Sequence, residues 1–218
     1  MLALSRRLAV ARENILSRQL AQPLGRALLG KTACIVGLGS VGLALANVLH
    51  AFGMRVVATR RDVAQGAPSF VQLFAQDRLR EALGLADYVI LCVRADADNV
   101  RLIDATHLAA MRKGAILVNV ARGSLLDEEA LRVALQSGHL RGAGLDVFAI
   151  EPPEPDSALL AMPQVLATPH IAGVTDVNVE RSLLAIAENL RRWERGEIPR
   201  FVVNAVNKDG LARRTRSK

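Results

Sequence analysis

The sequence has few aromatic residues and only two cysteines, and each scarcity narrows the range of functions. Aromatic residues make up 3% of the 218 residues, and the arginines are spread over many segments. The net charge of +7 is therefore weak support for a nucleic-acid partner, which we do not expect. Cys34 and Cys92 each lie in an apolar, strand-like run and form no CxxC pair, which favours core packing over a disulfide or a metal site.

Long apolar runs are missing as well. Charged residues or glycines interrupt every apolar stretch, so the sequence predicts no membrane span. The N-terminus carries charges throughout and has neither the apolar core nor the cleavage site of a signal peptide, so we expect a cytoplasmic protein. The same segment predicts one amphipathic helix, with Leu4, Leu8, Ala11 and Ile15 on one stripe.

Strand-like and helix-like segments alternate along the rest of the chain, which is typical of a parallel sheet covered by helices on both faces. The expected strands cover residues 32–36, 55–59, 88–93, 115–120, 142–148 and 165–167. The expected helices cover 41–52, 78–85, 105–112, 128–137 and 176–193, and the apolar stripe of the last one predicts a buried face. Residues 61–77 contain Gly66 and Pro68 and are expected to be irregular.

A glycine-rich loop joins the first expected strand to the first expected helix. Gly37, Gly39 and Gly42 form the pattern GxGxxG, with Ser40 and Val41 before the last glycine. In a dinucleotide-binding loop the first glycine makes the tight turn, the second lets the backbone approach a pyrophosphate, and the third lets helix and strand pack closely. The alternative is a plain strand–helix turn, which the flanking elements disfavour. The loop predicts a doubly wound α/β Rossmann fold with flanking N- and C-terminal helices.

The residues after the second expected strand bear on the choice of cofactor. NAD enzymes place an acid there for the adenosine ribose, whereas this chain has Arg60 and Arg61, and Asp62 comes two positions late. Guanidinium groups pair with a 2′-phosphate, so the sequence favours NADP over NAD. The alternative is that both arginines are solvated loop residues.

Three polar residues follow later strands at the edge where open α/β sheets bind ligands. Arg122, Glu151 and His170 each have an ordinary explanation alone, as a surface arginine, a loop carboxylate and a turn histidine. Together they suit hydride transfer. His170 would exchange a proton with a substrate hydroxyl, Glu151 would hold its imidazole, and Arg122 would bind a substrate carboxylate. The sequence shows no metal-binding cluster and no nucleophile elbow.

Four segments in order, GKTACIVGLGSVG, LVNVARGSLLDEEAL, GAGLDVFAIEPP and TPHIAG, resemble the D-isomer-specific 2-hydroxyacid dehydrogenase family. The resemblance implies an NAD(P)-dependent oxidoreductase acting on a small 2-hydroxy or 2-keto acid, with Arg122, Glu151 and His170 as the catalytic set. It also implies cofactor contacts at a larger set of residues. These are Gly37, Gly39, Ser40, Val41, Gly42, Thr59, Arg60, Arg61, Cys92, Val93, Val120, Ala121, Arg122, Asp146, His170 and Gly173.

The chain departs from the family pattern at Arg94, which stands where relatives usually have a proline. The resemblance divides the chain into a linking and dimerisation helix (1–24), an NAD(P)-binding domain (25–173), a C-terminal helix and extension (174–206) and a basic tail (207–218) that we expect to be disordered. An N-terminal substrate domain is expected to be absent, so we expect the chain to bind cofactor but to show little or no activity by itself. The resemblance also implies a homodimer through the first helix, whose apolar stripe would otherwise be exposed. The alternatives are a non-enzymatic NAD(H)-responsive binding module and a truncated relic. The presence of all three catalytic residues argues against the binding module.

Overall fold

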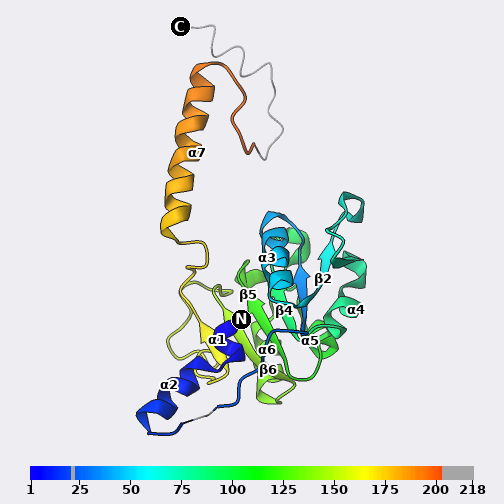
Figure 1. Cartoon of the computed structure of the whole chain (residues 1–218), viewed down its shortest axis with the longest axis vertical. Helices are drawn as coiled ribbons and strands as arrows, with labels where there is room; N and C mark the ends of the chain where they lie inside the picture. The colour runs from blue at the N-terminus through cyan, green and yellow to red at the C-terminus, as the bar shows by residue number, and fades with distance from the viewer. Residues whose placement is uncertain (21–22, 203–218) are drawn as a thin grey trace. The chain divides into compact units, whose positions relative to one another are not determined.

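The computed structural model describes residues 1–20 and 23–202 and divides into two units, Met1–His170 and Ile171–Lys218. The first unit contains a seven-stranded parallel sheet in the order β3-β2-β1-β4-β5-β6-β7, in which Figure 1 labels β2, β4, β5 and β6. The strands are β1 (Thr32–Val36), β2 (Arg55–Arg60), β3 (Val71–Ala75), β4 (Tyr88–Leu91), β5 (Ala115–Asn119), β6 (Leu140–Leu145) and β7 (Val165–Ala167). This is the α/β fold that the sequence predicts.

Helices cover both faces of this sheet and create two separate cores. On one face the strands pack against α4 (Leu79–Gly84), α5 (Ala105–Ala110) and α6 (Glu128–Gln136). On the other face they pack against α3 (Ser40–Ala51) and α1 (Leu2–Ser5). Because they are covered on both sides, β1, β4 and β5 are buried at every position, which explains their continuous apolar sequences.

The order of the strands places the candidate site. β1 pairs with β2 on one side and with β4 on the other, with Val36 opposite both Thr59 and Leu91. The chain leaves β1 for one face and β4 for the other, so a crevice opens at the carboxyl ends of these strands. The glycine loop and the segments that follow β2 and β4 all start at this edge.

The expectation that residues 61–77 are irregular is wrong in part. Val71–Ala75 forms β3, which pairs in parallel with β2 from Val56↔Val71 to Arg60↔Ala75. Gly66 and Pro68 do belong to the connecting loop, with a short 3-10 turn at Val63–Gln65 before them. The strand is short and lies at the edge of the sheet, so its alternation of buried and exposed residues is a weak signal beside those breakers.

The single N-terminal helix expected from the sequence is also wrong. Arg7 has a left-handed backbone (φ 51°) and separates α1 from α2 (Leu8–Leu16), which has no buried residue. Helix α1 does pack, because Gly142 and Gly144 leave room for Leu4, whose methyl carbons would lie 3.7 and 3.1 Å from added Cβ atoms. Ser5 is fully buried, and its Oγ lies 2.9 Å from the Tyr88 hydroxyl.

The remaining elements differ from expectation mainly at their ends. Strands β4, β5 and β6 end two, one and three residues earlier than expected, and α5 ends at Ala110 rather than 112. Asp127 caps α6 as predicted, since its Oδ1 accepts a hydrogen bond from the Ala130 N–H at 2.9 Å. Within the described range, no helix is long and apolar enough to cross a membrane.

The second unit contains helix α7 (Asp176–Glu194), one residue longer than predicted. Within the described part of this unit the helix has no buried residue, and its stripe is exposed at Val179, Leu183, Ile186, Leu190 and Trp193, so the predicted buried face stays a prediction. The basic tail, 207–218, lies outside the described residues, and the limits of the four predicted regions stay predictions.

Candidate functional site

The glycine loop has the geometry that a pyrophosphate needs. Gly37 has φ +98°, and an added Cβ would lie 2.7 Å from the Val93 backbone. An added Cβ at Gly42 would lie 2.3 Å from the Gly37 carbonyl oxygen, so helix and loop pack without space for a side chain. At Gly39 an added Cβ would meet nothing within 4 Å. The loop is therefore closed on the protein side and open on the outer side, as a cradle for an anion requires.

The helix that follows the loop favours a negative charge at its start. Gly39 is the N-cap of α3, no side chain caps this end, and the first turn has no acidic residue. Ser40 and Val41 form the first turn and are exposed. The positive end of the helix dipole thus faces outward beside Gly39, where backbone N–H groups can bind a phosphate oxygen.

A pocket of about 600 Å³ extends from the glycine loop along the ends of β2 and β4. It brings together seven of the predicted cofactor contacts: Gly37, Gly39, Thr59, Arg60, Arg61, Cys92 and Val93. Thr59 is buried, and its carbonyl oxygen accepts hydrogen bonds from the Gly37 and Leu38 N–H groups at 3.2 and 3.0 Å. The end of β2 therefore holds the glycine loop in place.

Three charged residues that line this pocket, Arg60, Arg61 and Asp62, form hydrogen bonds with other residues of the chain. Arg60 donates to the Gly66 carbonyl at 2.9 Å and also to the Gln65 side chain. Arg61 donates to Asp96 Oδ2 at 3.0 Å. Asp62 accepts from the Ala64 N–H and from Gln65 Nε2, at 3.1 and 3.0 Å. The one carboxylate after β2 is thus used inside its own turn. Gln65, Arg94 and Asp96 line the pocket too, and sequence reasoning did not assign them to it.

The predicted catalytic pair comes together at the carboxyl ends of β6 and β7. His170 Nδ1 lies 2.8 Å from Glu151 Oε2, and Glu151 Oε1 accepts a hydrogen bond from the Phe148 N–H at 3.0 Å. His170 has φ 56°, and its N–H donates to the Asp146 carbonyl at 2.9 Å. The contact with Glu151 leaves Nε2 as the imidazole nitrogen available to a substrate.

Asp146 and Thr168 support this pair from the same strands. Asp146 is buried, and its Oδ1 accepts a hydrogen bond from the Thr168 hydroxyl at 2.5 Å. Asp146, Glu151 and His170 line a second pocket of about 510 Å³ together with Phe148 and Pro152. The three predicted residues Asp146, Glu151 and His170 therefore line the same pocket as Phe148 and Thr168, which hydrogen-bond to Glu151 and Asp146.

Arg122 lies in the loop after β5, and buried neighbours fix its backbone. Asn119 is fully buried, donates to the Arg122 carbonyl at 2.9 Å and accepts from the Ala121 N–H at 3.0 Å. An added Cβ at Gly123 would lie 1.8 Å from the Phe148 carbonyl carbon, so this loop packs tightly against the chain leaving β6. Arg122 is exposed, and the positive charge of its guanidinium helps to lower the pKa of Glu151. The sequence signal for Asn119 is a polar residue that ends a fully apolar strand.

Some predicted contacts stay predictions. Val120 and Ala121 follow β5 at the same edge of the sheet but line neither of the two pockets. Gly173 belongs to the second unit, which is described by itself. No group of metal-binding side chains occurs within residues 1–20 and 23–202.

The electrostatics of the Glu151–His170 pair give a testable pH dependence. The hydrogen bond from His170, followed by that from the Phe148 N–H, holds the pKa of Glu151 below its usual value, and the Arg122 charge adds a smaller effect. Because the folded state lowers this pKa, the pair stabilises the fold above the ordinary Glu pKa of about 4.3, and this contribution is lost as the pH falls through the folded value.

We expect ¹³C NMR of the side-chain carboxyls to show that the pKa of Glu151 lies below its usual value. His170→Asn should raise the Glu151 pKa toward its ordinary value, because the first-named cause is removed. Glu154 offers a control, since it lies in the same exposed loop and no described residue hydrogen-bonds its carboxylate. An unchanged Glu151 titration in the variant would contradict the assigned hydrogen bond.

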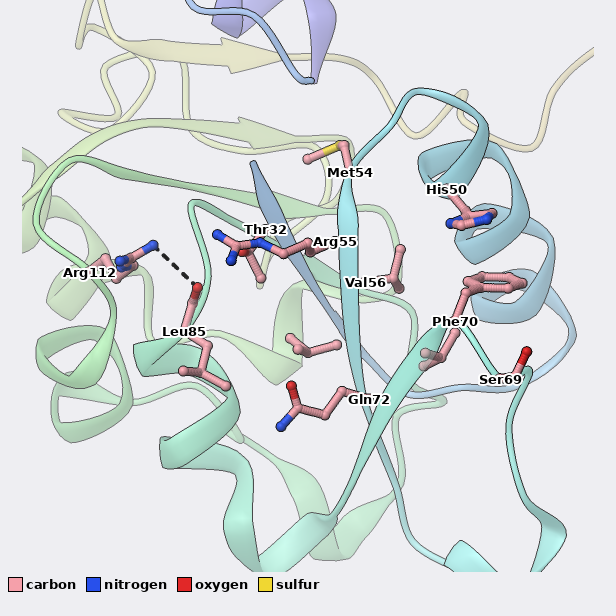
Figure 2. Close-up of a pocket in the computed structure, with 12 residues that line it drawn as sticks. Thr32, His50, Met54, Arg55, Val56, Ser69, Phe70, Gln72, Leu85 and Arg112 are labelled. Atoms are coloured by element: carbon pink, nitrogen blue, oxygen red, sulfur yellow. Dashed lines mark hydrogen bonds between the residues drawn. The ribbon is translucent and has the colours of Figure 1, made fainter. Parts of the chain in front are cut away.

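A separate hollow of about 570 Å³ lies at the amino ends of β2 and β3, away from the glycine loop. Figure 2 shows His50 and Phe70 on one side of β2, and Leu85 and Arg112 on the other. The two rings stack with centroids 4.2 Å apart, and Arg112 donates to the Leu85 carbonyl at 3.4 Å. Its lining includes none of the predicted site residues, so it is not part of the candidate active site.

The fold and the loop define the class of this domain. A doubly wound parallel sheet with a glycine loop between β1 and α3, open at Gly39 and closed at Gly37 and Gly42, is a dinucleotide-binding domain. The sequence profile of the D-isomer specific 2-hydroxyacid dehydrogenase NAD binding domain matches residues 1–172, and the chain belongs to this family.

Named relatives agree with this assignment. The chain is 41% identical to D-3-phosphoglycerate dehydrogenase of Mycobacterium leprae over 188 residues, which are 85% of this chain and 34% of that protein. It is 40% identical to glyoxylate reductase of Pyrococcus furiosus, over 83% of this chain and 53% of the relative. The chain therefore spans between a third and about half of the length of these relatives.

A solved structure gives the same result for the fold. The crystal structure of a D-isomer specific 2-hydroxyacid dehydrogenase from Xanthobacter autotrophicus, in complex with NADPH and MES, superposes with a TM-score of 0.80 at 32% identity. The match covers 96% of this chain and 84% of that one.

Proposed function

We propose that this chain is the cofactor-binding and catalytic part of an NAD(P)-dependent 2-hydroxyacid dehydrogenase or reductase. The observation that carries the proposal is the contact between His170 Nδ1 and Glu151 Oε2, at 2.8 Å, on the same edge of the sheet as the glycine loop. A proton-exchanging group beside a dinucleotide cradle is what the interconversion of a hydroxyl and a carbonyl group requires.

The contact between Glu151 and His170 supports the roles that we propose for the chain's own residues. When bound, the nicotinamide supplies or accepts the hydride. In the direction of reduction, His170 gives a proton from Nε2 to the carbonyl oxygen of the substrate, and it takes one back in oxidation. Glu151 accepts from Nδ1, which orients the ring and stabilises its charged form. Arg122 binds the substrate carboxylate and helps to polarise the carbonyl.

The cofactor we propose is NADP, with NAD as the weaker ligand. Arg60 and Arg61 line the pocket at the end of β2, where a 2′-phosphate would lie. Asp62 supports this choice, because both of its carboxylate oxygens already accept hydrogen bonds within the turn, from the Ala64 N–H and from Gln65 Nε2. The glyoxylate reductase and the NADPH-bound relative make glyoxylate and NADPH the first pair to test.

We also propose that two copies associate through the N-terminal segment. Leu8, Ile15 and Leu16 of α2 are 54%, 58% and 64% exposed, and exposed apolar side chains this close together favour a partner surface. Light scattering should give about twice the single-chain mass of 23.4 kDa, and Leu8→Glu with Leu16→Glu should return it to the single-chain value. A monomer at all concentrations would contradict the dimer. The cytoplasmic location stays a prediction.

The reaction is tested by single turnover, with the chain in excess over NADPH and with saturating glyoxylate. We expect slow but measurable oxidation of NADPH, since the His170 and Glu151 side chains are 47% and 38% exposed and water competes at this site. Mass spectrometry should detect glycolate in equal amount. Tight NADPH binding without product from any small 2-keto acid would contradict the proposed reaction and favour a binding module.

A further inference from the structure

The pocket beside the glycine loop contains a third arginine besides the two that follow β2. Arg94 follows β4 and lines the pocket together with Arg60 and Arg61. Its guanidinium is exposed and makes no hydrogen bond or ion pair with any other described residue. Of the three arginines that line the pocket, Arg94 is therefore the one whose side chain has no partner among the described residues.

The backbone around Arg94 is held firmly against the glycine loop. The Cys92 N–H donates to the Val36 carbonyl at 2.8 Å, and the Val93 backbone is the group that an added Cβ at Gly37 would meet. Asn99 is buried; it donates to the Arg94 carbonyl and accepts from the Asp96 N–H, both at 2.8 Å. A long side chain on so fixed a backbone stays beside the pocket at a small cost in entropy.

The three guanidinium groups differ in what each must give up to bind a phosphate. Both terminal nitrogens of Arg60 already donate within its loop, to Gly66 and Gln65. Arg61 would have to leave Asp96, whose charge offsets its own. Arg94 gives up only water and presents all five of its donors. A phosphate dianion should therefore gain most from Arg94.

We propose that Arg94 binds the 2′-phosphate of NADP and is a main determinant of the preference for NADP over NAD. This inference rests on the proposed function, and it adds a specificity residue from the loop after β4 to the arginines after β2. Asp96 keeps Arg61 in an ion pair at 3.0 Å, whereas Arg94 has no carboxylate partner among the described residues.

The test uses the adenosine half of each cofactor, so that catalysis plays no part. Adenosine 2′,5′-bisphosphate and AMP are titrated calorimetrically into the full chain and into Arg94→Gln. We expect the variant to bind the bisphosphate about 10- to 100-fold more weakly, because a charged hydrogen-bonded contact is lost, and to bind AMP unchanged within about twofold. Arg94→Lys should recover part of the bisphosphate affinity, since it keeps the charge without the fork.

Arg80→Gln is the matched control, because Arg80 is exposed on α4, has no partner among the described residues and does not line the pocket. It should change neither affinity by more than about twofold, the screened effect of one distant charge. Equal losses for both probes in Arg94→Gln, or no loss for either, would overturn the inference while leaving the cofactor site intact. A native chain that binds neither probe would instead contradict the proposed function.

Discussion

Gly39→Ala is expected to weaken cofactor binding and to leave the fold intact, whereas Gly42→Ala is expected to destabilise the fold. An added Cβ at Gly39 meets nothing within 4 Å, and the residue does not have a positive φ, so a methyl group is accepted there. The same methyl group occupies the space through which the pyrophosphate approaches the backbone. We expect NADPH affinity to fall about 10- to 100-fold, the equivalent of one or two lost charged hydrogen bonds.

Comparison with Gly42→Ala distinguishes a loss of cofactor binding from a loss of stability. At Gly42 the methyl group would be 2.3 Å from the Gly37 carbonyl oxygen and 3.2 Å from Ile35, so backbone must move. We expect a loss of about 1–3 kcal/mol in the free energy of unfolding, as for other overpacked sites, against about 1 kcal/mol or less for Gly39→Ala at an N-cap. Urea denaturation and NADPH titration of both variants check this. Retention of full NADPH affinity in Gly39→Ala would show that the cofactor lies elsewhere.

His170→Asn is expected to lower the rate of glyoxylate reduction about 100- to 10,000-fold, the usual contribution of a general acid. Asparagine is the suitable replacement because His170 has φ 56°, a left-handed backbone that asparagine adopts readily. The loss should appear in the single-turnover rate, with NADPH affinity changed little. Glu151→Gln should cause a smaller loss, because an amide oxygen still accepts from Nδ1 but brings no charge to stabilise the protonated ring.

The chain offers a control of the same chemistry. His107 lies 2.7 Å from Asp104 through its Nδ1, in a second histidine–carboxylate pair on α5 that lines neither site pocket. His107→Asn should leave the turnover rate unchanged within experimental error. If both histidine variants lose activity equally, the effect is on folding, and the assigned role of His170 is wrong.

The sequence predicts correctly those structural features that depend on local spacing. The glycine loop is a local pattern, and the structure shows Gly37 and Gly42 closed by backbone contacts and Gly39 open. Glu151 and His170 were expected at neighbouring strand ends, and parallel strands bring those ends to one edge. Periodicity located most strands, with errors of a few residues at their ends, because the limits of an element depend on tertiary contacts.

The sequence does not predict features whose determining contact is made by backbone or by distant residues. The hydrogen bond from the Phe148 N–H to Glu151 cannot be predicted from the sequence, because any residue other than proline could supply this backbone donor. The pairing of Arg61 with Asp96 joins residues 35 positions apart, and the use of Asp62 inside its own turn depends on the loop conformation. The break at Arg7 follows from its left-handed backbone, which no glycine or proline signals.

The most direct test of the account is a calorimetric titration of the purified chain with NADPH and, separately, with NADH. We expect saturable binding of one NADPH per chain, at least about tenfold tighter than NADH, because Arg60, Arg61 and Arg94 line the pocket and their guanidinium groups can pair with a 2′-phosphate. Binding of neither dinucleotide would contradict the central claim that this domain holds a cofactor at Gly39. Tighter binding of NADH would keep the cofactor site and refute the role given to its arginines.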